Sequence, residues 1–280
     1  MGHVRDPLII TSPANPRVKA LPLLRRRRTR EQEGRTLIEG YEELRLALDA
    51  GVVPHVLFYC PDLMGPEALT FGLVDRIGGL GTELVQLSRA AFAKAAYREG
   101  PDGFLAVVDT VDRRCADMSA LLPDCPLVLV AQGVEKPGNL GAMLRTADAA
   151  GVDAVIAADP VTDWGNPNTV RASKGTVFSV PVASDSTAVT LDWLREHGIP
   201  LVAATPEADL AHTDVDYTGA VAIAVGTEKA GLTPALIAAA DHRVRIPMVG
   251  RADSLNVATS AAIIVYEAVR QRRQGGVRGD

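Results

Sequence analysis

The pattern of apolar and polar positions divides the chain into two halves. In the first half, short apolar runs alternate with amphipathic stretches that have helical spacing. This alternation predicts a small α/β domain over residues 1–110. The spacing predicts a basic helix over 15–35 with breaks at Pro22 and Gly34, further helices over 41–51, 66–79 and 88–97, and strands over 36–40, 52–59, 82–87 and 103–109.

The second half has a different pattern, in which the apolar runs are nearly continuous. Such runs cover 126–131, 153–158, 199–205 and 220–226. Strands that are buried on both faces have this composition, so we predict a parallel sheet covered by helices. The helices are expected over 139–151, 187–198, 233–241 and 254–273. Residues 125–280 would then form a second α/β domain, joined to the first by a linker over 111–124.

Composition indicates a globular protein of the reducing cytosol. The 280 residues are 47% hydrophobic and 22% charged, and no apolar run is long enough to cross a bilayer. The three cysteines are scattered and odd in number, which argues against disulfides, and the five histidines have no metal-ligand spacing. We therefore expect a cytoplasmic protein with no membrane segment and no metal.

Charge is distributed unevenly along the chain. The net charge is −5, yet residues 1–30 hold one acid, Asp6, among many basic residues. Such a cluster on an acidic protein indicates a local binding surface for phosphates, or a solvated helix face. The basic residues are Arg5, Arg17, Lys19, Arg25, Arg26, Arg27, Arg28 and Arg30.

Three loops of the second half are rich in glycine and polar residues. They read "QGVEKPGNLG" from 132, "VGTEKAGLT" from 225 and "IPMVGRADSLNVATS" from 246. The first two follow predicted strands and the third follows "HRVR" (242–245). Ligands of open parallel sheets bind beyond the carboxyl ends of strands. We expect a binding site there.

A dinucleotide site is the first alternative. Gly138 and Gly141 match part of its glycine pattern, and Asp159 ends the next strand, where a ribose-binding acid would lie. The full G-x-G-x-x-G pattern is absent, as are a P-loop and a G-x-S-x-G motif.

Together the three loops resemble the motifs of the SpoU (TrmH) branch of the SPOUT RNA methyltransferases. The first motif is represented by Asn139, Gly141 and Arg145. The second and third are represented by Gly226, Thr227 and Glu228 in "AVGTEKAGL", and by Ser254 and Asn256 in "IPMVGRADSLNVATSAAI". The resemblance covers roughly residues 125–270. The first half, with "SPANPRVKAL" and "TLIEGYEEL", more loosely resembles a ribosomal-protein-like RNA-binding domain.

The resemblance implies methyl transfer from S-adenosylmethionine (AdoMet) to a ribose 2′-hydroxyl of RNA. It also implies a parallel-sheet SPOUT domain with a deep trefoil knot and a homodimer with active sites at its interface. Ribosomal RNA, most of all 23S, is the expected substrate, and some relatives with this domain order confer antibiotic resistance. The alternatives are a tRNA 2′-O-methyltransferase and a non-catalytic RNA-binding protein with a SPOUT fold.

The same resemblance implies the catalytic residues. Arg145 would stabilise the developing alkoxide. The alternative is a purely structural role, in which Arg145 forms an ion pair with Asp148. Asn139 would orient Arg145 or the ribose, or cap its helix. Glu228 would hold Asn139, Arg145 or a backbone amide of a loop, or lie exposed. Ser254 would offer a hydroxyl or an N-cap, and Asn256 would brace the loops.

The residues that would bind AdoMet and RNA can also be named. AdoMet would bind mainly through backbone groups and an apolar slot, made by Ala204, Thr205, Gly226, Glu228, Gly231, Ile246, Met248, Leu255 and Val257. RNA phosphates would be held by Lys19, Arg25, Arg26, Arg27 and Arg28 in the first domain, and by Arg171 and Lys174 in the second.

Overall fold

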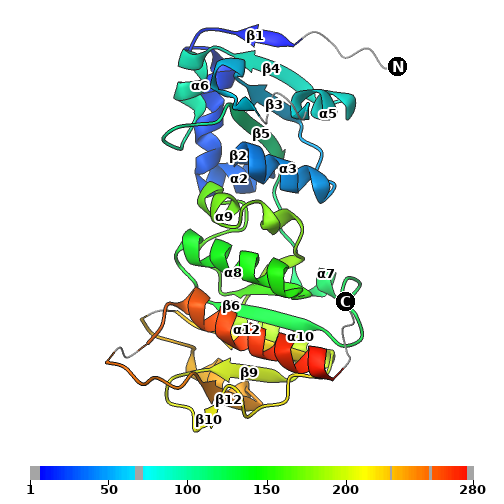
Figure 1. Cartoon of the computed structure of the whole chain (residues 1–280), viewed down its shortest axis with the longest axis vertical. Helices are drawn as coiled ribbons and strands as arrows, with labels where there is room; N and C mark the ends of the chain where they lie inside the picture. Colours follow the sequence, from blue (N-terminus) through cyan, green and yellow to red (C-terminus); the bar gives the residue numbers. More distant parts are fainter. Residues whose placement is uncertain (1–6, 67–71, 228, 252–253, 276–280) are drawn as a thin grey trace. The chain divides into compact units, whose positions relative to one another are not determined.

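The computed structural model describes residues 7–66, 72–227, 229–251 and 254–275. The chain forms two compact units (Figure 1). Unit 1 consists of Met1–Val111 together with Asp163–Ser179, and unit 2 consists of Asp112–Thr162 together with Val180–Asp280. Both units are α/β, in agreement with the predicted fold class.

Unit 1 is built on a five-stranded mixed sheet in the order β1-β4-β3-β5-β2. β1, β4 and β3 are parallel, whereas β5 is antiparallel to both β3 and β2. The four predicted strands are confirmed, and the short edge strand β1 was not predicted. The bounds are β1 Leu8–Ile10, β2 Arg35–Glu39, β3 Val56–Tyr59, β4 Glu83–Leu87 and β5 Phe104–Asp109.

The predicted basic helix over 15–35 is wrong as a single element. It is divided into α1 (Pro16–Ala20), the 3-10 turn η1 (Leu21–Arg25) and α2 (Arg27–Glu33). Pro22 lies in η1, where a residue without an amide hydrogen interrupts the α-helical ladder. Gly34 ends α2 in the left-handed conformation, as a C-terminal glycine often does.

The remaining helices of the first 111 residues follow the prediction more closely. Ser88 caps α6 by accepting a hydrogen bond from the amide of Ala91. The predicted helix over 66–79 is described only in part, because 67–71 lie outside the described residues. The bounds are α3 Tyr41–Asp49, η2 Pro61–Leu63, α5 Leu73–Gly79 and α6 Arg89–Ala95.

The segment Asp163–Ser179 packs in unit 1, although the sequence places it inside the predicted second domain. It contains α9 (Pro167–Ala172) and the 3-10 turn η3 (Thr176–Phe178), which lie against β2 and α3. Thr36 donates a buried hydrogen bond to the carbonyl of Gly165. A side chain at Gly175 would come within 2.6 Å of the Glu43 carbonyl oxygen. These contacts use backbone and hydroxyl groups, which leave no periodic signal in a sequence.

Unit 2 is built on a seven-stranded sheet in the order β10-β12-β9-β11-β6-β7-β8, with every pair parallel. β6, β7 and β11 are buried at every residue, which confirms the strands predicted from continuous apolar runs. The bounds are β6 Leu127–Gln132, β7 Ala154–Ala158, β8 Val182–Asp185, β9 Leu201–Ala204, β10 Leu210–Ala211, β11 Val221–Val225 and β12 His242–Arg245.

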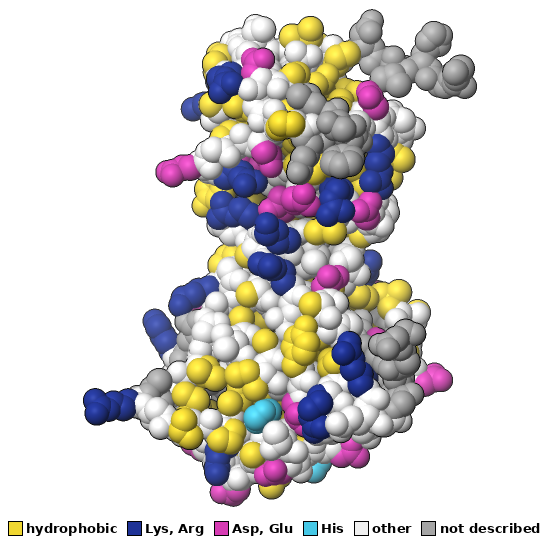
Figure 2. All heavy atoms as spheres, in the orientation of Figure 1, with side chains coloured by type: hydrophobic (Ala, Val, Ile, Leu, Met, Phe, Trp, Pro, Cys, Tyr) yellow, Lys and Arg dark blue, Asp and Glu magenta, His cyan; other side chains and the backbone are white. Residues whose placement is uncertain are grey.

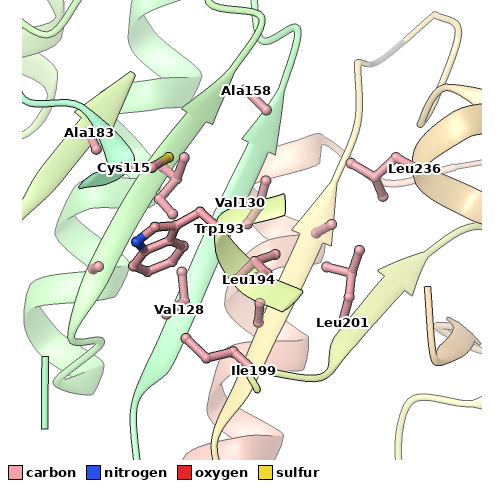
Figure 3. Packing of buried hydrophobic residues seen from close by; sticks show 14 of the residues in the cluster. Cys115, Val128, Val130, Ala158, Ala183, Trp193, Leu194, Ile199, Leu201 and Leu236 are labelled. Carbon is pink, nitrogen blue, oxygen red and sulfur yellow. The ribbon is translucent and has the colours of Figure 1, made fainter. Parts of the chain in front are cut away.

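Helices cover both faces of this sheet. On one face, Trp193 and Leu194 pack with Val128, Val130 and other strand residues in a single hydrophobic cluster (Figure 3). Successive strand residues point to opposite faces, so the buried Leu129 faces the other layer. There α12 packs against α8 and β11 (Figure 1). The bounds are α7 Cys115–Met118, α8 Pro137–Ala150, α10 Thr187–Glu196, α11 Pro234–Ala239 and α12 Val257–Gln274.

The predicted linker over 111–124 is not a free connection. Its middle forms α7, and both Cys115 and Met118 are fully buried in the cluster that contains Trp193. Burial raises the pKa of the Cys115 thiol to about 12, so it is a packing group. All three cysteines lie within the described residues, and each is a free thiol.

The strand order reverses between β6 and β11. From β6 the chain proceeds to β7 on one side, whereas β11 and β9 lie on the other. Such a switch leaves a crevice at the carboxyl ends of the two central strands. The trefoil knot implied by the resemblance stays a prediction.

Candidate active site

A cavity of about 660 Å³ lies at the carboxyl edge of the unit 2 sheet. Three stretches form most of it: the loop after β9, the loop after β11, and the stretch from the end of β12 to the start of α12. Two of the three glycine-rich loops predicted to bind a ligand therefore meet in one hollow. The lining includes Glu207, Thr227, Lys229, Leu232, Arg243, Arg245 and Ser254.

The residues predicted to bind the cofactor gather in this cavity. Eight of them line it, although they are spread over more than fifty positions of the chain. Glu228, the ninth, lies outside the described residues. The eight are Ala204, Thr205, Gly226, Gly231, Ile246, Met248, Leu255 and Val257.

Gly226 allows the loop after β11 to fold back on itself. A side chain there would overlap the carbonyl group of Gly231 and the amide nitrogen of Leu232. Thr227 and Gly231 exchange two backbone hydrogen bonds of 3.0 Å, and Gly231 has a φ of +65°. The close approach that glycine permits at 226 is thus between two parts of the protein backbone, which shape one wall of the cavity.

The first and third motifs meet through two asparagines. The Asn256 side-chain amide donates to the Asn139 side-chain oxygen at 3.2 Å. Asn256 also caps α12, because its own oxygen accepts hydrogen bonds from the amides of Ala258 and Thr259. The predicted bracing role of Asn256 fits this geometry. Because Lys136 is the N-cap of α8 and Asn256 that of α12, the capping alternatives for Asn139 and Ser254 are wrong.

Arg145 lies exposed on α8, six residues after Asn139, and does not line the cavity. Within the described part of the chain, Arg145 makes no ion pair with Asp148 or any other carboxylate. The ion-pair alternative is therefore wrong for the described chain. Within a single chain, Ser254 lines the cavity and Asn139 is hydrogen-bonded to Asn256 beside it. Arg145 does not line the cavity of its own chain.

Sequence reasoning missed a buried amide that ties three elements together. Gln132, only 2% exposed at the end of β6, donates to the hydroxyls of Thr187 and Thr233 at 2.6 and 2.9 Å. Its oxygen accepts from the amide of Thr233 at 2.8 Å. Asp159, the acid considered for a ribose, instead accepts from the amide and hydroxyl of Thr187. These bonds fix the starts of α10 and α11 relative to the strand ends.

Glu207 is a second group that sequence reasoning missed. It lines the cavity two residues after Thr205, whose hydroxyl donates to the Glu207 carboxylate and lowers the pKa of that carboxyl. The signal that could have found it is its place in the loop that follows β9. An ionised Glu207 and the basic Lys229 give the cavity rim both signs of charge.

The basic residues assigned to RNA all lie in unit 1. Lys19, Arg25, Arg26, Arg27 and Arg28 do so as predicted, while Arg171 and Lys174 lie in the segment that unit 1 incorporates. Figure 2 shows Lys and Arg side chains intermixed with Asp and Glu on the visible face of this unit. Other members of the basic cluster are structural. Arg30, 2% exposed, pairs with Asp163 at 2.5 Å, and Arg17 pairs with Glu83 at 2.6 Å.

Two absences apply to the described ranges only. In these residues no cluster of three or more His, Cys, Asp or Glu side chains could hold a metal ion. None of the described helices is both long and apolar enough to cross a membrane.

Comparisons with known proteins agree with the two-part organisation. The SpoU rRNA Methylase family matches residues 126–266, and the MRM3-like substrate binding domain matches residues 15–106. A 23S rRNA (guanosine(2553)-2′-O)-methyltransferase of Bacillus subtilis is 31% identical over 258 residues, which are 92% of this chain and 97% of that protein.

Solved structures agree over nearly the whole chain. The crystal structure of an RNA 2′-O ribose methyltransferase matches with a TM-score of 0.80 and 40% identity, over 95% of this chain and 100% of its own. An AdoMet-bound rRNA methyltransferase from Sinorhizobium meliloti matches with a TM-score of 0.83 and 29% identity, over 94% of this chain and 97% of its own. On this evidence, the chain belongs to the SpoU rRNA methylase family.

Proposed function

We propose that this protein transfers a methyl group from AdoMet to a ribose 2′-hydroxyl of ribosomal RNA, with 23S rRNA as the expected substrate. The observation that carries the proposal is the cavity at the carboxyl ends of β9, β11 and β12, beside Asn256 and its hydrogen bond to Asn139. The relatives named above support the reaction and the RNA class. An enzyme of ribosomal RNA in a bacterial cell would act in the cytoplasm.

The cavity suits AdoMet in size and chemistry. Its volume lies within the range of about 300–1,000 Å³ that is typical of small-molecule sites. Ile246, Met248 and Leu255 would form the apolar slot for adenine, and the turn from Gly226 to Gly231 would offer backbone groups. Glu207 is the acid available for a hydroxyl or an ammonium group. AdoMet, when bound, would supply a methyl group on a sulfonium sulfur, and the neutral thioether that departs is a good leaving group.

The protein's own task is to make the ribose hydroxyl reactive. Arg145 suits the stabilisation of a developing alkoxide and the positioning of a neighbouring phosphate, because its guanidinium presents several donors in a fixed fork. A guanidinium is a poor proton acceptor, because it keeps its proton in proteins. Ser254, at the cavity, can hydrogen-bond the ribose or phosphate, and Asn139 is oriented by Asn256.

Arg145 would reach the reaction from a second copy of the chain. Along α8 it lies six residues from Asn139, which is roughly 9 Å along the axis and about 120° around it. It therefore faces away from the group that borders the cavity in its own chain. This placement supports a homodimer in which Arg145 of one protomer completes the site of its partner.

The reaction is tested with tritiated AdoMet and purified 23S, 16S and transfer RNA, followed by mapping of the methylated ribose. Label at one 2′-hydroxyl of 23S rRNA is the expected result, and its position would show whether it falls at an antibiotic-binding region. Label in tRNA alone would show that the substrate is tRNA and not 23S rRNA. No label combined with no AdoMet binding by calorimetry would favour a non-catalytic RNA-binding protein.

The shared site is tested by complementation. We expect Arg145→Ala to lower turnover roughly 10²- to 10⁴-fold while AdoMet affinity stays nearly unchanged. Mixing this variant with Gly226→Ala, which has a damaged cavity, should restore activity, because mixed dimers then hold one intact composite site. If Arg145 acts within its own chain, no mixture of the two variants recovers activity. Arg195→Ala, an exposed arginine paired with Asp192, is the control and should leave turnover unchanged.

A further inference from the structure

Tyr97 presents an aromatic ring on the surface of unit 1. The residue follows α6 and is 49% exposed. Its backbone is nevertheless fixed. The amide of Tyr97 donates to both oxygens of the Glu39 carboxylate at 3.0 and 3.1 Å, and the amide of Arg98 donates to one of them at 3.1 Å. The ring is thus held at a defined place while much of its surface meets solvent.

Two arginines from distant parts of the sequence lie over this ring. The guanidinium carbon of Arg25 is 5.1 Å from the ring centroid and that of Arg171 is 5.7 Å from it. Arg25 comes from the region matched by the substrate-binding domain, whereas Arg171 comes from the region matched by the methylase family. All three residues lie in unit 1, so the cluster is a property of that unit alone.

No carboxylate of the described residues neutralises either guanidinium group. Among the described residues neither makes an ion pair: Arg25 donates to the Ala95 carbonyl and Arg171 to the Asn168 side chain. The buried Nε of Arg25 has no hydrogen-bond partner. Other arginines of the same unit are paired with acids, as Arg45 is with Glu42 and Asp49. Two uncompensated cations beside an exposed ring make an anionic ligand with a flat, π-rich group the best match.

The backbone around Arg171 is fixed at the cost of local strain. Lys174 has a φ of 57°, which non-glycine residues seldom adopt, and it is followed by Gly175 packed against the Glu43 backbone. The ion pair of the buried Arg30 with Asp163 holds the start of the same segment. Arg171 and Lys174 are exposed, so their cationic groups are presented from a rigid base.

We propose that Tyr97, Arg25 and Arg171 form a binding site for one unpaired nucleotide of the RNA substrate. The base would stack on the Tyr97 ring or on a guanidinium plane, and the freed guanidinium would bind the flanking phosphates. A paired base inside an A-form helix has both faces covered, so the site selects single-stranded RNA. The identity of the ligand as RNA rests on the proposed function, whereas the site itself rests on the geometry of unit 1.

The test uses a short unstructured oligouridine with one 2-aminopurine, whose fluorescence falls when the base stacks, and a duplex of the same length. With wild-type protein, binding should quench the fluorescence, and the single strand should bind more tightly than the duplex. Tyr97→Ala should abolish the quenching and weaken single-strand binding about 10-fold, with duplex binding changed less than about twofold. Tyr97→Phe keeps the ring and should retain both properties. Arg171→Ala should weaken binding about threefold and reduce its dependence on salt.

Controls separate this site from folding and from catalysis. Arg45→Ala removes a paired, exposed arginine of the same unit and should change neither affinity nor quenching. Should Tyr97→Ala fail to fold, Tyr97→Leu replaces it, because leucine fills space without a π-face. Equal loss for duplex and single strand, or quenching that survives loss of the ring, would overturn the proposal. Quenching and affinity are both measured without methyl transfer. They would therefore test the binding site even if the methylation assay failed.

Discussion

The cavity of unit 2 and the Tyr97 surface of unit 1 are built on opposite principles. The cavity is shaped by backbone that passes so closely that Gly226 has no room for a methyl group. The Tyr97 surface consists of exposed side chains that project from a fixed backbone. Shape made by backbone is sensitive to the smallest substitution, whereas a set of exposed cations loses affinity in small and separate steps. The same residue type should therefore have very different weight in the two regions.

Arginine gives the sharpest form of this comparison. Arg272 of α12 is 1% exposed, and its guanidinium donates to the carbonyls of Cys125, Pro126, Tyr217 and Gly219. We expect Arg272→Met to lower the free energy of unfolding by about 3–5 kcal/mol, because several buried carbonyls lose their donor. Chemical denaturation measures this.

The control for that variant lies two residues earlier in the same helix. Arg270 is exposed and pairs with Glu267 at 2.7 Å. Arg270→Ala should cost less, about 1 kcal/mol, because the Arg270 guanidinium is exposed and the buried Glu267 carboxylate keeps its hydrogen bond from Gln271. Equal effects of the two substitutions would show that burial does not distinguish them.

Gly226→Ala is the next largest effect and tests the backbone-built cavity. The new methyl group must displace the turn at Gly231, which should cost about 1–3 kcal/mol and lower AdoMet affinity roughly 10- to 100-fold. Titration calorimetry measures the affinity. Gly219→Ala is the matched change, since no atom of its surroundings lies within 4 Å of the added carbon, and it should bind AdoMet normally. A tolerated alanine at 226 would contradict the cavity as described.

The smallest effect belongs to the exposed arginines of α2. Among the described residues Arg28 has no ion pair, whereas its neighbour Arg27 pairs with Glu31 at 2.7 Å. If Arg28 contacts one RNA phosphate, Arg28→Ala should reduce the slope of log affinity against log salt by roughly 0.7–0.9. Arg27→Ala should change the slope less, because Glu31 already offsets its charge. RNA binding measured at several salt concentrations gives the slope for each variant. The same slope for Arg28→Ala and Arg27→Ala would show that Arg28 does not contact an RNA phosphate.

The two regions also differ in how far sequence predicts them. Strands β6, β7, β9 and β11 of unit 2 were predictable because continuous apolar runs follow from burial on both faces, whereas β8, β10 and β12 have no such run. The carboxyl ends of parallel strands necessarily meet at one edge of the sheet. Residues as distant as Ala204 and Val257 were assigned to one slot from the resemblance to the SpoU motifs, and both line the cavity at that edge. The position of Arg145 on α8 was predictable as well. That Arg145 does not line the cavity was not predictable, because the spacing of a motif does not show which face of the helix points toward the cavity.

The incorporation of Asp163–Ser179 into unit 1 was beyond prediction. It depends on the Thr36 hydroxyl, on a glycine that fits against Glu43, and on a single buried ion pair of Arg30. None of these has a periodicity, and each depends on a partner more than one hundred residues away. Arg171 was therefore assigned to the second domain, whereas it lies in unit 1, on a helix that was not predicted.

The Arg272 contacts have a consequence for the order in which the protein is made. α12 follows every other described element along the chain, yet it supplies Asn256 to the site and fixes itself to residues 125–126 and 217–219. During synthesis, the parts of the cavity wall that precede α12 leave the ribosome before Val257 and Ser260 of α12, which also line the cavity. The bond between Asn256 and Asn139 can form only after α12 has emerged, so a nascent chain that still lacks α12 has no complete site.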